Sequence, residues 1–115
     1  MDMSENSGRC VLCGASVYDQ KYYFNKDFDK LPEDVKKELN IICVLFTEEI
    51  GGVFRMEFDE DGELMFVTDA DEEDLLYDEI GSALMVKEIQ KSKQDLCESL
   101  KLFYKYMVLH EDVEF

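Results

Sequence analysis

The clearest hydrophobic pattern in the chain lies between residues 33 and 50. Its apolar side chains recur at intervals of four, three, four and four residues, at Val35, Leu39, Ile42, Phe46 and Ile50. These intervals place them on one face of a helix, and Pro32 suits a first helical turn. Gly51 and Gly52 end the pattern, because glycine accepts the left-handed conformation that a helix C-terminus often needs. The pattern predicts a helix over 33–50, although the apolar run 41–46 alone is also typical of a buried strand.

The next segment, "VFRMEFDEDGELMFVT" (53–68), alternates between apolar and polar positions. In its first half Phe54, Met56 and Phe58 fall on one side, and charged side chains fall between them. After an Asp-Gly turn, Leu64 and Phe66 repeat the apolar side. This alternation predicts a β-hairpin with one side on a core and the other in water.

The pattern becomes helical again after residue 69. In "DADEEDLLYDEIG" acidic residues precede an apolar pattern, as is favourable at the positive end of a helix dipole. The apolar positions then fall on two opposed faces. The first face holds Leu76, Tyr77, Ile80 and Leu84, and the second holds Met85, Ile89, Leu96, Leu100, Phe103 and Met107. A break near Gly81-Ser82, giving a short helix and then a long one, explains the change; one bent helix is the alternative.

These elements define a single α+β domain over residues 10–109. We expect an antiparallel sheet that includes the 53–68 hairpin, packed against the 33–50 helix and a long C-terminal helix. The aromatic segment "KYYFN" adds a strand near the N-terminus. Residues 1–9 are predicted to be a disordered tail, and residues 110–115 an acidic tail.

The net charge of the chain argues against some classes of binding partner. Among 115 residues there are 12 basic and 28 acidic side chains, a formal net charge of −16. A field of this sign repels nucleic-acid phosphates and anionic lipid surfaces. Solubility is the simplest role of the charge, and a surface for a basic protein partner is the alternative. The acidic N-terminus and the absence of a long apolar run predict a cytoplasmic protein, in which cysteines stay reduced.

Three runs of sequence, "CGASVYDQKYYFN", "LFTEEIGGVFRMEF" and "LLYDEIGSALMVKE", resemble a family of small acidic proteins from anaerobic Gram-positive bacteria. The resemblance covers roughly residues 11–108. It implies a bacterial domain of unknown function, and it transfers no activity, ligand or catalytic residue onto this chain.

Cys10 and Cys13 form a CxxC pair followed by glycine, which is typical of half of a zinc site. A structural zinc ion needs four ligands, usually in two close pairs. The other candidates, Cys43, Cys97 and His110, are far apart in sequence, so the second pair is missing. We expect Cys43 and Cys97 to be small buried hydrophobic residues. A redox-active CxxC is not favoured either, since no helix pattern follows it.

A second metal candidate is the acidic cluster Glu57, Asp59, Asp61 and Glu63 around Gly62. It follows the first half of a calcium-binding loop, but Thr68 stands where the bidentate glutamate belongs and strands flank it. A polar hairpin turn is the simpler interpretation, with weak calcium binding as the alternative. Nothing predicts catalysis: His110 is the only histidine, no phosphate-binding glycine loop is present, and the acids are too numerous to single out a pair.

The last helical segment, "LKLFYKYMVL" (100–109), is apolar on more than one side. Leu102, Tyr106 and Leu109 project away from the stripe that faces the core. They are the predicted interface of a homodimer, unless N-terminal strands cover them. The sequence thus favours a non-catalytic interaction module with an acidic surface. The alternative is a small protein that binds zinc at Cys10 and Cys13 or calcium at the hairpin.

Overall fold

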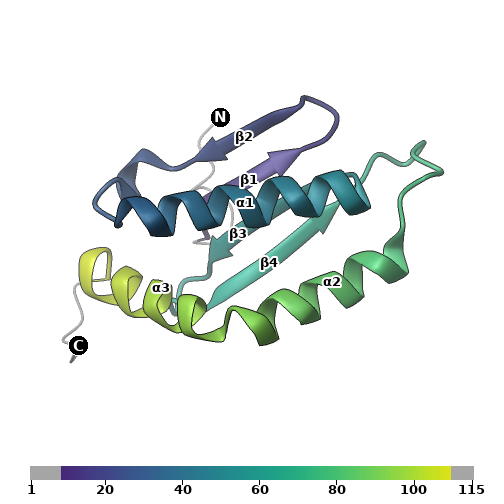
Figure 1. Ribbon diagram of the computed structural model, residues 1–115. Helices are drawn as coiled ribbons and strands as arrows, with labels where there is room; N and C mark the ends of the chain where they lie inside the picture. Colours follow the sequence, from purple (N-terminus) through teal and green to yellow (C-terminus); the bar gives the residue numbers. More distant parts are fainter. Residues whose placement is uncertain (1–8, 110–115) are drawn as a thin grey trace.

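The computed structural model describes residues 9–109, and the predicted tails therefore lie largely outside the described residues. The chain forms two layers, an antiparallel sheet and three helices that lie together on one side of it (Figure 1). The predicted α+β architecture is confirmed.

Four strands make the sheet, in the order β2-β1-β3-β4. Their bounds are β1 (Cys10–Ser16), β2 (Lys21–Phe24), β3 (Val53–Phe58) and β4 (Leu64–Asp69). All neighbours are antiparallel, and β1 lies between β2 and the later strand β3. The register of β1 against β3 shifts between Val11 and Cys13, which is a β-bulge.

In the 53–68 hairpin Met56 lies opposite Phe66 and Phe58 opposite Leu64, so the apolar positions of the two strands share one face, as predicted. Phe54, Met56 and Phe58 are fully buried against the helices. Alternation therefore identified the core side of this hairpin correctly, because helices cover that face of the sheet. The expectation that the opposite side lies in water is wrong for Glu57, which is buried there.

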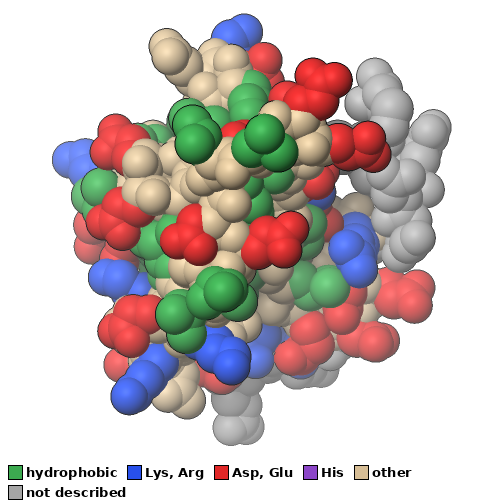
Figure 2. All heavy atoms as spheres, turned by 90° about the vertical axis from the view of Figure 1, so that its right-hand side faces the viewer, with side chains coloured by type: hydrophobic (Ala, Val, Ile, Leu, Met, Phe, Trp, Pro, Cys, Tyr) green, Lys and Arg blue, Asp and Glu red, His purple; other side chains and the backbone are tan. Residues whose placement is uncertain are grey.

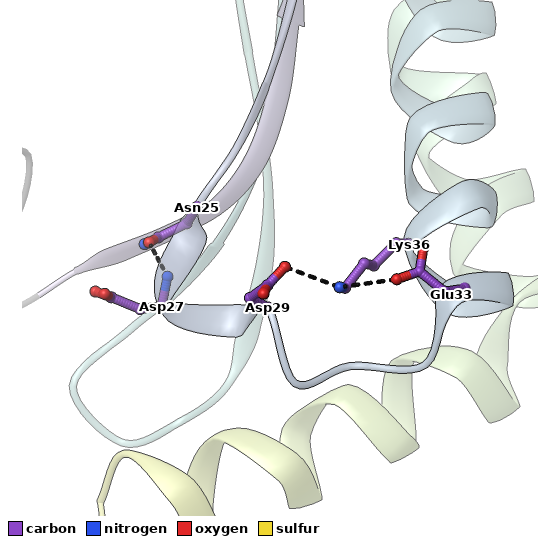
Figure 3. A network of polar contacts seen from close by, with 5 residues as sticks. All are labelled: Asn25, Asp27, Asp29, Glu33 and Lys36. Atoms are coloured by element: carbon purple, nitrogen blue, oxygen red, sulfur yellow. Dashed lines mark hydrogen bonds and ion pairs between the residues drawn. The ribbon is translucent and has the colours of Figure 1, made fainter.

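Helix α1 (Glu33–Ile50) has the predicted bounds and packs on β1 and β3. A short 3₁₀ turn, η2 (Lys26–Phe28), precedes it and buries Phe28. The side chain of Asn25 accepts a hydrogen bond from the Asp27 amide at the start of this turn. Lys36 of α1 then reaches Asp29 at 2.9 Å and Glu33 at 3.3 Å, which joins the turn to the first helical turns (Figure 3).

The C-terminal region is two helices, α2 (Glu79–Ser92) and α3 (Gln94–Met107). The predicted break near Gly81-Ser82 is wrong: α2 runs through both residues, and the break falls at Lys93. Gly81 is part of the first turn of α2, where its amide donates to the Asp78 carboxylate at 2.8 Å. The helix therefore begins three residues after Leu76, and residues 70–78 form a loop.

The core is centred on stacked aromatic rings. Phe58 of β3 lies 4.2 Å from Tyr104 of α3 between ring centroids, and Phe28 stacks on both. The helical stripe read from the sequence did not include Tyr104, which is buried. Its contact with Phe58 anchors α3 to the sheet.

Candidate functional site

The CxxC pair lies along one strand, and its two thiols have different surroundings. Cys13 is buried, and its Sγ lies 3.6 Å from Sγ of Cys43 on α1. Cys10 is half-buried, with its Sγ 3.9 Å from Nδ2 of Asn25. Within residues 9–109, no three His, Cys, Asp or Glu side chains are grouped closely enough to hold a metal ion. His110 lies outside the described residues.

The surroundings of Cys10, Cys43 and Cys97 favour neutral thiols. Contact with the Cys13 thiol, together with burial, raises the pKa of Cys43. Burial raises the pKa of Cys10 and of Cys97, and it also raises the pKa of the nearby Tyr22 phenol. Because the thiolate is the nucleophile and the metal ligand, this arrangement opposes both chemistries at Cys10, Cys43 and Cys97.

The acidic residues of the hairpin contact different partners. Glu57 is buried on the sheet, where its carboxylate lies 2.8 Å from Nε of Arg55. Asp59 accepts hydrogen bonds from the amides of Asp61 and Glu63, and these bonds close the turn. Glu63 forms an ion pair with Lys101 of α3. Glu57, Asp59 and Glu63 thus form local hydrogen bonds and ion pairs, and their carboxylates do not converge on one metal site.

The predicted interface, on α3 and just after its end, is only partly exposed. Tyr106 is half exposed, Leu102 is half-buried, and Leu109 is half-buried and packs against the core. Two of the three side chains are thus partly covered within the chain, and Leu109 lies close to Gly62 in the turn between β3 and β4.

Four strongly exposed aliphatic side chains lie elsewhere, at the start of α2 and in the loop before it. Leu75 is 92% exposed and Leu76 is 93% exposed, while Ile80 and Leu84 are 76% and 63% exposed. Ile80 and Leu84 are one helical turn apart on the same side of α2. We call these four residues the aliphatic patch. Figure 2 shows this end of the molecule, where hydrophobic side chains reach the surface between acidic ones.

The loop that carries Leu75 and Leu76 is tied to the rest of the fold. The Tyr18 hydroxyl, from the turn between β1 and β2, donates to the Asp74 carboxylate at 2.7 Å. The same oxygen accepts from the Asp71 amide at 3.0 Å. The Tyr77 hydroxyl donates to Ser82 at 2.9 Å. Both leucines are therefore held outward by a loop that is itself anchored.

Gly52 adds a further constraint on this loop. It has a φ of +68°, and a Cβ at this position would collide with the Asp69 carbonyl and the Tyr77 ring. Glycine therefore allows the end of β4 and Tyr77 to pack closely against the start of β3.

A hollow of about 740 Å³ lies between β4, α2 and the loop that joins them, and none of the four patch residues lines it. Its lining includes the apolar residues Phe66 and Val86. The charged residues of the lining are five acids and one lysine: Asp69, Asp71, Glu72, Asp74, Glu79 and Lys87. Such a lining attracts cations and repels phosphates and carboxylates.

The two site predictions that rested on sequence motifs, the cysteines and the hairpin acids, do not coincide with the patch. The sequence did contain a sign of it, since Leu76, Ile80 and Leu84 were recognised as an apolar row. Periodicity gives the spacing of such a row and does not show whether other elements cover it.

Comparison with known proteins gives a family for the chain. The model of a family of unknown function (DUF6145) matches residues 9–112. No curated protein and no solved structure matches the chain. Within the described residues, no helix is long and apolar enough to cross a membrane. Because the matched segment is nearly the whole sequence, the chain belongs to this family of unknown function.

Proposed function

We propose that this member of DUF6145 is a non-catalytic, cytosolic protein-interaction module that binds a cationic amphipathic segment of a partner protein. The binding surface is the aliphatic patch with the acidic residues around it. The observation that carries the proposal is the exposure of Leu75 and Leu76, above nine-tenths in both, within an anchored loop. The four free cysteines suit a reducing compartment such as the cytosol.

Apolar contact supplies the affinity in this proposal. Full burial of one leucine side chain is worth about 1.5–3 kcal/mol relative to exposure. An isolated exposed leucine is common on protein surfaces, but adjacent exposed aliphatic groups are typical of binding surfaces. The loop is already ordered by Tyr18, so a partner does not have to order it on binding.

The acidic residues around the aliphatic patch indicate that the partner segment is positively charged. Residues 69–79 contain seven acids, Asp69, Asp71, Glu72, Glu73, Asp74, Asp78 and Glu79. The sequence has no lysine, arginine or histidine between Met56 and Val86. A segment with lysine or arginine beside its apolar side chains would match this surface and would be steered to it by the field. The same field disfavours nucleic acid and anionic membranes.

A synthetic helix of leucine and lysine, labelled with a fluorophore, is a suitable probe for fluorescence anisotropy. A second peptide, with serine in place of leucine, keeps the charge and removes the apolar side. We expect the leucine peptide to bind and the serine peptide to bind more weakly by about tenfold or more.

Variants locate the binding. Leu75→Ser/Leu76→Ser should weaken binding of the leucine peptide by about tenfold or more. Ile41→Ser/Leu45→Ser, which changes two exposed aliphatic residues of α1, should leave it unchanged. Equal binding of both peptides, or equal binding by both variants, would show that only general charge attraction is present and would contradict the proposal.

A further inference from the structure

A second exposed surface lies on α1, on the side of the helix away from the sheet (Figure 1). Ile41 is 54% exposed and Leu45 is 45% exposed, although Ile42 and Phe46 beside them are buried in the core. We infer that this face of α1 is a contact between two copies of the chain, arranged as a symmetric antiparallel pair of helices.

The exposed face of α1 is a regular row. Lys37, Ile41, Leu45 and Glu48 are all exposed and follow one another at intervals of four, four and three residues. Residues at these intervals are neighbours on one side of a helix. The row therefore has two aliphatic side chains in its middle, a lysine at its N-terminal end and a glutamate at its C-terminal end.

This order of side chains is complementary to itself. When two copies of α1 pack antiparallel about a two-fold axis near residue 43, Ile41 meets the partner's Leu45. The same axis places Lys37 opposite the partner's Glu48. Each contact occurs twice, as a two-fold interface requires. A parallel arrangement would instead bring Lys37 to the partner's Lys37.

A groove beside the row provides room for the partner's aliphatic side chains. It has a volume of about 490 Å³ and lies between α1 and α2. Ile42, Met85 and Ile89 contribute apolar lining next to Ile41 and Leu45. Side chains from one helix inserted between those of another are the usual way in which helices pack, at axis separations of about 8–10 Å.

The net charge of −16 opposes any pairing of two copies. The groove itself is balanced in charge, because the charged residues in its lining are two acids and two lysines: Asp34, Glu38, Lys37 and Lys93. Lys93 and Glu38 also form an ion pair at 3.2 Å. The acids of 69–79 belong to the other end of α2, so self-association and binding at the aliphatic patch use different surfaces.

Sedimentation velocity of the full chain, from micromolar to millimolar concentration, tests the inference. We expect a reversible monomer–dimer equilibrium that shifts toward dimer as salt screens the net charge. Ile41→Ser/Leu45→Ser should abolish the dimer, and Leu75→Ser/Leu76→Ser should leave it unchanged. Leu102→Ser/Tyr106→Ser changes the face of α3 that the sequence suggested, and it should also leave the dimer intact.

Charge exchange gives a test that does not depend on loss of a contact. Lys37→Glu alone and Glu48→Lys alone should each weaken the dimer, because each places like charges opposite each other. The double variant Lys37→Glu/Glu48→Lys should restore it, since the pairs are re-formed with reversed sign. A chain that is monomeric throughout, or a double variant no better than the single ones, overturns the inference.

Discussion

The thiols of Cys13 and Cys43 lie 3.6 Å apart in the core, and neither side chain has access to solvent. Cys10, three residues before Cys13, lies at the half-exposed start of the same strand. The two cysteines of the CxxC pair thus differ in burial, and a change at each should have a different effect on stability.

Replacing Cys13 with serine should destabilise the fold by about 1–3 kcal/mol, because a hydroxyl would be buried in an apolar site. Cys10→Ser should cost clearly less, since water reaches that position. Urea unfolding of both variants gives the comparison. Equal losses at the two positions would indicate that both thiols act in one shared site, such as a bound metal.

Alkaline pH should lower the stability of the fold. Contact with Cys13 and burial raise the pKa of Cys43 above its ordinary value, and burial raises the pKa of Cys10 and Cys97. The unfolded chain then loses its thiol protons first, at about pH 8.5. The stability gained from the neutral thiols is therefore complete below that pH and is lost as the pH rises toward the folded-state values.

Urea unfolding between pH 7 and pH 10 measures this effect. Cys43→Ala should be less stable at every pH and should show a smaller decrease above about pH 8.5, because one shifted thiol is gone. A free energy of unfolding that is constant over the whole interval would contradict the assignment of buried neutral thiols.

At the scale of elements, the two best predictions were α1 and the 53–68 hairpin. Each element buries one side against its neighbours, so the residues that the apolar spacing places on one face are also the buried ones. The start of α2 was mispredicted for the opposite reason. Leu76 and Ile80 continue an apolar row but are exposed, and the helix begins only where the Asp78 side chain bonds the Gly81 amide.

Asp78 should therefore be worth about 1 kcal/mol to the fold as the N-cap of α2. We expect Asp78→Ala to lower the free energy of unfolding by that amount and to loosen the loop that holds Leu75. Glu73→Ala removes the same charge from an exposed position and is the matched control. Thermal unfolding with amide hydrogen exchange would show both effects, and equal behaviour of the two variants would exclude the cap.

For the whole molecule, the balance between seven described ion pairs and a net charge of −16 determines how salt acts. Most of the paired side chains are at least partly exposed, where ion pairs are weak. Repulsion among 28 acids acts over the whole surface, and at about 0.15 M salt it is screened beyond about 8 Å.

The melting temperature should therefore rise with sodium chloride, most steeply at low concentration. Sucrose, which is uncharged, stabilises by exclusion and should lack the steep initial rise. Differential scanning calorimetry distinguishes the two curves. A melting temperature that falls with salt would mean that the ion pairs outweigh the repulsion.

The sequence predicted the fold class because local patterns define a helix, a hairpin and more helix, which leaves few ways to cover one apolar sheet face. It could not predict the contact between Cys13 and Cys43, since they are 30 residues apart and meet only through the topology. The aliphatic patch could not be predicted for a related reason. The exposure of a side chain depends on the folded chain, and the spacing of apolar residues in the sequence does not determine it.

The strand order has a consequence for the path by which the chain folds. The β1–β2 and β3–β4 pairs are local hairpins, whereas pairing of β1 with β3 brings Cys10 opposite Phe58 and closes a loop that contains all of α1. Closing this loop costs chain entropy before the β1–β3 contacts can form and offset that cost. The transition state should therefore contain this central seam, with Ala15 opposite Phe54. Substitutions there should slow refolding in stopped-flow experiments, while changes at the Asp61-Gly62 turn should mainly speed unfolding.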